Sequence, residues 1–466
     1  MSGQPEFAFE QSGADADLLT RLFVKADQVL IKKLSNNDRL WARQKEDSEG
    51  RPVPGKRMNN QAGVYIPHEP RDGGFFLPLE LKDRTDGKTD EIWERFFETI
   101  WPQVSETRKS RLVNYRSKSQ ETHVTGIPRE AFIDLSPASY LVMGRVTRNG
   151  EHTFECMTID SVSDDAGLLA ELFDLGADFL IGIFEPAERK ALERDKVLDF
   201  AEQVIAAWLA GTIGQFASCN ATMPVTAELA RVAQSAFLKK RGLESINPFT
   251  LEAPGDALRE ISRSIEWDLF REFQRRERSV ELVRIVLGNS ARTITASEVI
   301  RRLIDEYQTI DALLLSASQQ RKSRAGYSYE HHIEAMLAGG GIPFEKQVII
   351  EAKKRPDFIL PSLAFIDSGK ETAATGLILS AKTTLRERWK QVEREKGSRR
   401  LFLTTVDENI AGNAIDDMAS FGVHLVIPES LTKSKEAEYE GRANVVSFGQ
   451  FCNEIVHPHM VGWRRI

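Results

Sequence analysis

Residues 376–396 are GLILSAKTTLRERWKQVEREK, and this stretch decides the fold of the second half of the chain. It begins with a short apolar run, which predicts a buried strand that ends just before Lys382. Charged residues at helical spacing follow, so we expect a helix over residues 385–395. Outward from this unit we expect strands at residues 347–351, 357–360, 400–404 and 423–427, and helices at residues 327–337 and 408–420. Strands that alternate with helices predict an α/β core whose sheet is at least partly parallel.

The first half of the chain has a different pattern, with short β-rich segments. Residues 139–160 hold two such segments joined by Asn149-Gly150, which predicts a β-hairpin. Residues 90–104 carry apolar side chains at helical spacing, and we expect a helix there. These patterns favour a small barrel or sandwich with flanking helices. We therefore expect an N-terminal domain at residues 1–186, a connection at residues 187–223 and a second domain at residues 224–466.

Composition sets limits on partners and location. The 466 residues suffice for two or three domains of ~150 residues each. No apolar run approaches the ~20 residues that span a bilayer, and three scattered cysteines do not indicate a disulfide framework. We expect a cytoplasmic protein with no membrane partner. The net charge of −7 argues against nucleic acid, but residues 382–400 hold eight basic residues against three acidic ones, a local charge of +5.

A candidate catalytic site lies at the strand ends of the α/β core. Asp357 stands at the start of one expected strand, and Lys382 follows the end of another. Carboxylates can hold Mg²⁺, and a lysine can offset charge on a phosphate, as phosphodiester hydrolysis requires. The common form of this PD-(D/E)xK pattern has an acid two residues before the lysine, where this chain has Ser380. Glu395 and Glu330 are the candidate replacements, although single acids on helices are more often solvated surface residues.

Basic groups near this site point to DNA. Arginine can bind guanine with two hydrogen bonds and glutamate can accept one from cytosine, so an Arg-Glu-Arg triplet can recognise G·C pairs. A surface ion-pair cluster is an equally good explanation of such a triplet. A further basic patch precedes the first strand of the core. The candidate DNA contacts from these two groups are Arg386, Glu387, Arg388, Arg321, Lys322 and Arg324.

Several of these stretches resemble the EcoRII-type (type IIE) restriction endonucleases. The resemblance rests on QRKSRAGYSYEHHIEAML (320–337), KKRPDFILPS (353–362), SAKTTLRERWKQVEREK (380–396) and GVHLVIPESL (422–431), with IKKLSNND (31–38) and AGVYIP (62–67) upstream. It implies a restriction-endonuclease-like α/β/α core behind an N-terminal B3-like DNA-binding barrel. It also implies a homodimer that makes Mg²⁺-dependent double-strand cuts at a CC/GG-containing site (CCNGG- or CCWGG-like) and leaves 5′-phosphate ends. Activation by a second, effector copy of that site is implied as well.

Site residues follow from the resemblance position by position. It implies a catalytic set of Glu330, Asp357, Lys382 and Glu395, in which Asp357, Glu395 and Glu330 hold the metal. Effector-site contacts are implied in a region where this chain departs from the family pattern, and the candidates are Lys118, Gln120, Glu121 and His123. An ordinary polar loop is the plainer explanation for any one of those four.

Two other functions stay open on the sequence alone. A DNA-binding protein with a decayed nuclease fold would keep the N-terminal barrel, and a modification-dependent nuclease would use the triplet for another purpose. His331 and His332 are adjacent, so their side chains diverge by ~100° on a helix. We expect both to be exposed helix residues rather than metal ligands.

Overall fold

The computed structural model describes residues 8–47, 51–59, 61, 63–82, 91–115, 121–148, 150–289, 294–349, 355–368, 371–385, 389–390 and 399–463. The chain forms two compact units. Unit 1 comprises residues 1–192 together with two short segments from the second half, 408–412 and 433–440. Unit 2 comprises residues 193–407, 413–432 and 441–466. The domain bounds expected from the sequence, 1–186 and 224–466, include no such inserted segments.

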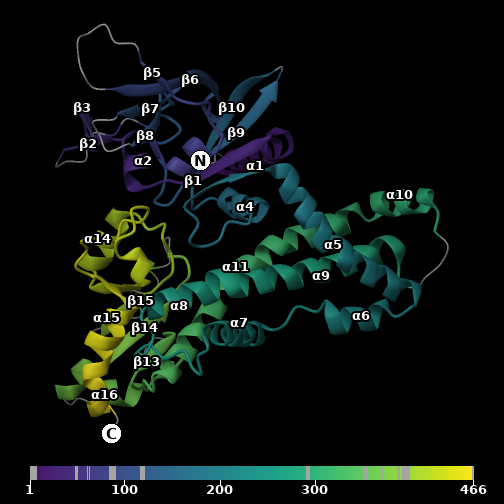
Figure 1. The fold of residues 1–466 in the computed structure, drawn as a ribbon. Coiled ribbons are helices and arrows are strands. Elements are labelled where there is room, and N and C mark those ends of the chain that lie inside the picture. Colours follow the sequence, from purple (N-terminus) through teal and green to yellow (C-terminus); the bar gives the residue numbers. More distant parts are fainter. Residues whose placement is uncertain are drawn as a thin grey trace, which may run out of the picture. The chain divides into compact units, whose positions relative to one another are not determined.

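Unit 1 is built around a nine-stranded sheet that curls into a half-barrel (Figure 1). The strand order is β11-β1-β9-β10-β6-β7-β8-β4, with β5 paired to β6. All pairings are antiparallel except that of β10 with β6. The strands are β1 (Gln28–Lys33), β4 (Val64–Ile66), β5 (Glu80–Leu81), β6 (Ile92–Trp101), β7 (Glu106–Tyr115), β8 (Thr122–Thr125), β9 (Tyr140–Arg148), β10 (Glu151–Ile159) and β11 (Ile181–Phe184).

Helices and a hairpin complete unit 1. Helices α1 (Ala8–Lys25) and α4 (Asp164–Phe173) pack on β9 and β1, where Leu22, Val29 and Phe173 form one buried cluster. A second cluster, around Trp101 and Phe132, fills the other face of the sheet. The smaller elements are α2 (Asn36–Leu40), α3 (His68–Asp72) and the hairpin of β2 (Gln44–Glu46) with β3 (Pro52–Arg57).

Two sequence predictions for unit 1 had opposite outcomes. The hairpin around Gly150 is confirmed, with β9 and β10 paired from Tyr140–Ile159 to Arg148–Glu151. The helix predicted over residues 90–104 is wrong, because most of that segment is strand β6. Its aromatic and β-branched residues suit a strand, and pairing with both β7 and β10 overrides the helical spacing.

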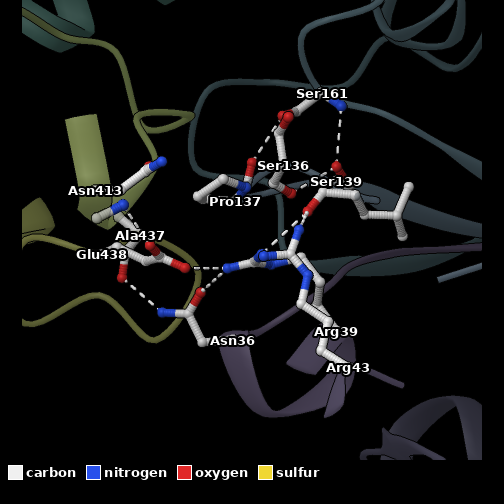
Figure 2. A network of polar contacts seen from close by, with 12 residues as sticks. Asn36, Arg39, Arg43, Ser136, Pro137, Ser139, Ser161, Asn413, Ala437 and Glu438 are labelled. Atoms are coloured by element: carbon white, nitrogen blue, oxygen red, sulfur yellow. Dashed lines mark hydrogen bonds and ion pairs between the residues drawn. The ribbon is translucent and has the colours of Figure 1, made fainter. Parts of the chain in front are cut away.

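The two inserted segments are held in unit 1 by hydrogen bonds and ion pairs, and Figure 2 shows those of the second segment, at Ala437 and Glu438. Lys33 Nζ lies 2.7 Å from Glu408 Oε1, and both side chains are largely buried. The Arg39 guanidinium, 2 % exposed, pairs with Glu438 and also donates to Leu135 O at 3.0 Å. Burial lowers the pKa of Arg39, and the charge of Glu438 opposes that change. Ala437 and Tyr439 of this segment are buried, so the segment packs against the rest of unit 1.

Unit 2 contains the predicted α/β core. Its six-stranded sheet has the order β12-β13-β14-β15-β16-β17, antiparallel from β12 to β14 and parallel from β14 to β17. The strands are β12 (Glu345–Lys346), β13 (Phe358–Leu360), β14 (Leu377–Ala381), β15 (Arg400–Thr404), β16 (Val423–Ile427) and β17 (Val445–Ser447). The strand predicted at residues 347–351 does not form over residues 347–349, since the pairing lies at Glu345–Lys346, and residues 350 and 351 lie outside the described residues. The predicted mixed α/β fold class is confirmed.

Helices of unit 2 cover the sheet and extend beyond it as an arm (Figure 1). One core cluster joins Phe237, Ile333 and Met336 to the strand residues Leu379 and Phe402. A smaller cluster around Trp208 and Val280 lies in the arm. The helices are α5 (Pro186–Leu209, which begins in unit 1), α6 (Ile213–Asn220), α7 (Thr226–Arg241), α8 (Pro254–Glu260), α9 (Glu266–Leu287), α10 (Ala296–Asp305), α11 (Tyr307–Gly339), α12 (Leu363–Ile366), α14 (Gly412–Ser420), α15 (Phe448–Gln450) and α16 (His457–Trp463).

Candidate active site

Asp357 and Lys382 meet at one end of the antiparallel pair β13 and β14. Asp357 immediately precedes β13, and Lys382 immediately follows β14. Because the two strands run in opposite directions, the start of one lies beside the end of the other. Asp357 Oδ2 accepts hydrogen bonds from the Ala381 backbone N–H at 2.7 Å and from Lys382 Nζ at 2.8 Å. The carboxylate is thus fixed by the strand and the ammonium together.

Glu330 adds a second carboxylate from helix α11. It is 8 % exposed, and Gln347 Nε2 donates to its Oε2 at 3.4 Å. Gln347 is in turn tied to the strand, since its backbone N–H donates to Asp357 O at 3.1 Å. Burial raises the pKa of Glu330, and the negative charge of Asp357 raises it further, whereas Lys382 acts in the opposite direction. The two acids are therefore close enough to repel each other, with Lys382 compensating in part.

Ser380 occupies the position where the common pattern has an acid. Its Oγ is buried and has no hydrogen-bond partner among the described residues. Buried hydroxyls nearly always have a partner, so an unpaired one indicates a missing group. Strand periodicity directs Ser380 to the same face as Lys382. The Ser380 hydroxyl, the Lys382 ammonium and the Asp357 carboxylate then lie on one face of the sheet, near Glu330.

This donor set fits a hydrated Mg²⁺ ion. Magnesium prefers oxygen ligands, keeps several waters and is commonly held by one or two carboxylates. Asp357 and Glu330 supply the carboxylates, and a metal-bound water would offer a partner to Ser380 Oγ. Among the residues placed by the structure, no three Asp, Glu, His or Cys side chains form a ready metal cluster. The third predicted ligand, Glu395, lies outside the described residues.

Buried polar contacts fix helix α11 behind the site. The Tyr329 hydroxyl lies 2.9 Å from Thr404 Oγ1 on β15, and burial raises the pKa of that phenol. His332 Nε2 lies 2.5 Å from Glu266 Oε2, and Ser328 Oγ donates to the other oxygen of the same carboxylate. His332 is 0 % exposed, so the expectation of an exposed histidine is wrong for this residue. The ring is buried because Glu266, at the start of α9, gives it a polar partner inside the core.

Asp407 is a site-supporting residue that sequence analysis missed. It is 3 % exposed and follows β15, and its Oδ2 accepts the backbone N–H of Leu385 at 2.8 Å. Leu385 begins the segment that carries the Arg-Glu-Arg triplet. Asp407 therefore fixes the chain just after Lys382 and just before the candidate base-contacting residues. An acid three residues after the end of a buried strand was the only local signal, and it does not identify Leu385 as the partner.

The remaining predicted site residues are described only in part. Arg386, Glu387 and Arg388 lie outside the described residues, as do Lys118 and Gln120. The patch of Arg321, Lys322 and Arg324 falls within helix α11, and its side chains are not described.

Two effector-site candidates are placed in unit 1. Glu121 is exposed and precedes β8, while His123 lies on β8 with its ring 5.8 Å from that of Tyr65. The two residues lie two positions apart along the chain.

Known proteins similar to this chain fall in one group. Residues 290–452 match the family described as EcoRII C terminal. The type II restriction enzyme EcoRII of Escherichia coli is 32% identical over 160 residues, 34% of this chain and 39% of that enzyme. The type II restriction enzyme SsoII of Shigella sonnei is 29% identical over 194 residues, 39% of this chain and 62% of that enzyme. The chain thus spans less than two thirds of either curated relative, and the predicted resemblance is confirmed for its C-terminal part.

Solved structures similar to this chain include two DNA complexes. Metal-depleted Ecl18kI with uncleaved, modified DNA aligns with a TM-score of 0.45 at 22% identity, covering 55% of this chain and 84% of that one. The B3 domain of the UbaLAI restriction endonuclease with cognate DNA aligns with a TM-score of 0.24 at 14% identity, covering 37% of this chain and 98% of that domain. Within the described part of the chain, none of the helices combines the length and apolar character needed to cross a membrane.

Proposed function

Since residues 290–452 match the EcoRII C-terminal family, we propose that this protein is a type II restriction endonuclease, a site-specific deoxyribonuclease acting on double-stranded DNA. The observation that carries the proposal is the Asp357–Lys382 pair, 2.8 Å apart at the ends of adjacent strands, with Glu330 beside it. A decayed nuclease would be expected to lose this set of two acids and a lysine. We further propose a cytoplasmic enzyme that recognises a CC/GG-containing site of the CCNGG or CCWGG kind.

The roles of the site residues follow from their chemistry. Mg²⁺ bound by Asp357 and Glu330, with Glu395 as the third ligand, would supply an acidic water and charge stabilisation at the phosphate. Asp357 holds Lys382 Nζ in place. Lys382, with 26% of its side chain exposed, presents its ammonium to charge that develops on the phosphate oxygens. Because metal ligands must be deprotonated, the raised pKa of Glu330 makes metal binding weaken as the pH falls.

DNA recognition is assigned to groups around this site. Arg386, Glu387 and Arg388 would contact C·G pairs, and Arg321, Lys322 and Arg324 would contact the backbone. Lys118, Gln120, Glu121 and His123 would contact an effector copy of the site in a B3-like N-terminal domain. We propose domains at residues 1–186 and 224–466 joined by residues 187–223. A homodimer would supply one active site for each DNA strand.

The test is cleavage of plasmid DNA by the full chain with Mg²⁺, followed by sequencing of the cut ends. We expect discrete fragments with a common CC/GG sequence and 5′-phosphates from the wild type. Lys382→Met and Asp357→Asn should abolish cleavage and leave Ca²⁺-supported DNA binding intact. The matched control is Lys240→Met, which removes a lysine from an exposed ion pair with Glu260 at 2.7 Å and should cleave normally.

Each other outcome points to a different conclusion. Undiminished Mg²⁺-dependent cleavage by both site variants would exclude this active site. Sequence-specific binding without any cleavage would instead indicate a DNA-binding protein. Cleavage only of methylated DNA would indicate a modification-dependent nuclease.

A further inference from the structure

Gln347 has a backbone conformation that residues other than glycine rarely adopt. Its φ is +53°, in the left-handed region, and it lies directly after β12. The other described non-glycine residues with a positive φ, Ser105, Ala138 and Asp174, all lie in unit 1. Such a conformation destabilises a fold and persists only where surrounding contacts impose it, often at a functional site. Among these four residues, Gln347 is the one at the candidate active site.

The left-handed conformation breaks the alternation of side chains along β12. Lys346 pairs with Phe358, which packs in the core cluster with Ile333 of α11. Successive side chains of a strand point to opposite faces, so a regular continuation would direct Gln347 away from α11. Instead, Gln347 Nε2 donates to Oε2 of Glu330 on α11, at 3.4 Å. At this length the hydrogen bond resembles those of many active sites without their substrate, which tighten on binding.

Two consecutive residues therefore contact the same helix. Lys346 Nζ lies 2.6 Å from Glu334 Oε2, while Gln347 contacts Glu330. The two acids are four positions apart on α11, so they are neighbours on its surface. The ion pair of Lys346 secures the end of β12 to the helix, which fixes the point from which Gln347 reaches Glu330.

Gln347 also links the two described acids that are proposed to hold the metal. Its backbone N–H donates to Asp357 O at 3.1 Å, and its side-chain amide donates to the Glu330 carboxylate. A donor on a carboxylate favours the charged form, which a metal ligand must have. It also fixes the orientation of the carboxylate, and groups that orient metal ligands contribute strongly to metal affinity. One residue thus sets the position of Glu330 relative to Asp357.

We propose that Gln347 is a positioning residue that orients Glu330 for metal binding, and that its left-handed conformation is kept because it directs the amide to Glu330. This inference rests on the proposed function and adds a residue that acts on the metal through one of its ligands. Glycine adopts this conformation without strain but has no amide to donate. Methionine keeps both the length of the side chain and the strain, and it also lacks the amide. The two substitutions therefore separate the backbone conformation from the hydrogen bond.

The first experiment measures metal binding by the full chain without DNA. Mn²⁺ suits the same oxygen ligands as Mg²⁺, and electron paramagnetic resonance reports the free ion. Gln347→Met and Gln347→Gly should both raise the Mn²⁺ dissociation constant about tenfold, as the loss of a group that orients a metal ligand typically does. Ser105→Gly is the matched control, because it relieves a φ of +55° at an exposed residue of unit 1 and should leave Mn²⁺ binding unchanged. Wild-type affinity in both Gln347 variants would overturn the proposal.

A double variant tests whether Gln347 acts through Glu330. Glu330→Gln removes the ligand itself, so the addition of Gln347→Met should cause no further loss of Mn²⁺ affinity. A merely structural role would make the two losses additive. Additive losses would therefore overturn the positioning role.

The second experiment measures the strain by thermal melting of metal-free protein. Both Gln347 variants lack the amide, but only glycine relieves the left-handed conformation. Gln347→Gly should therefore melt ~2 °C above Gln347→Met although the two bind Mn²⁺ equally weakly. A Gln347→Gly variant that melts no higher would show that the conformation is not strained and would overturn that part of the proposal.

Cleavage assays separate this role from the proposed function. Gln347→Met should need about tenfold more Mg²⁺ for half-maximal cleavage, while its KM for DNA at saturating Mg²⁺ stays that of the wild type. A raised KM for DNA with an unchanged Mg²⁺ requirement would show that Gln347 contacts DNA instead and would overturn the positioning role. A wild-type chain that binds Mn²⁺ in the predicted way but cuts no DNA would count against the proposed function alone. A chain that neither binds Mn²⁺ nor cuts DNA would overturn both.

Discussion

Asp357 has a structural role that can be separated from its proposed catalytic one. Its Oδ2 accepts the backbone N–H of Ala381, a residue that is 1 % exposed. Asp357→Ala leaves that amide buried without a partner, which costs ~1–3 kcal/mol. Asp357→Asn keeps an oxygen at the same place and loses the charged bond to Lys382, whose partly exposed ammonium can be solvated, so we expect a loss of about 1 kcal/mol.

Hydrogen exchange measures this difference at the amide itself. In metal-free protein, the Ala381 N–H should exchange roughly fivefold faster in Asp357→Ala than in Asp357→Asn, as a difference of ~1 kcal/mol between the central costs of ~2 and ~1 kcal/mol requires. Asp367→Ala, which breaks an exposed ion pair with Arg399, is the control and should change stability by less than ~0.5 kcal/mol. Equal exchange rates in the two Asp357 variants would refute the view that the Asp357 carboxylate protects the Ala381 N–H by hydrogen bonding to it. Both variants should lack cleavage activity.

Three further changes test the surroundings of the site and unit 1. Glu330→Gln should raise the urea midpoint of metal-free protein at pH 8, because the raised pKa of Glu330 means that its charged form destabilises the fold. This gain in stability should vanish as the pH falls below the ordinary pKa of glutamate. Tyr329→Phe should lower the unfolding free energy by ~1–2 kcal/mol, since buried Thr404 loses its hydroxyl partner; an unchanged midpoint would contradict this. Glu438→Gln should destabilise unit 1 by about 2 kcal/mol in thermal melts, because buried Arg39 loses its carboxylate, and a variant as stable as the wild type would show that the pair does not form.

The juxtaposition of Asp357 and Lys382 was predictable from strand ends. A short apolar run followed by Lys382, and an acid before a second run, sufficed to bring Asp357 and Lys382 together, because antiparallel neighbours juxtapose start and end. The position of Glu330 near this pair also agrees with its place on the preceding helix. The bond from Asp407 to Leu385 was not predictable, since it joins residues on different elements whose spacing carries no periodic signal.

Tertiary contacts explain the predictions that were wrong. The apolar spacing of residues 92–101 suits a helix, but the two neighbouring strands supply hydrogen bonds along its length. His331 and His332 were expected outside because adjacent side chains diverge on a helix, but the His332 ring is buried because Glu266 of a distant helix pairs with it. Local sequence does not contain the identity of such partners. The same limit applies to the segments 408–412 and 433–440, whose partners lie hundreds of residues away.

The discontinuity of unit 1 bears on how these proteins can be recombined. A cut between residues 192 and 193 removes from unit 1 the segments that contain Glu408 and Glu438, leaving Lys33 and Arg39 without their acids in the interior. To exchange unit 1 between related proteins, all three of its chain segments would therefore have to be replaced together. The acids that pair with Lys33 and Arg39 would then be kept. Gene fusion at one junction would produce a destabilised hybrid. Inheritance of the two halves as a pair is the arrangement that this fold favours.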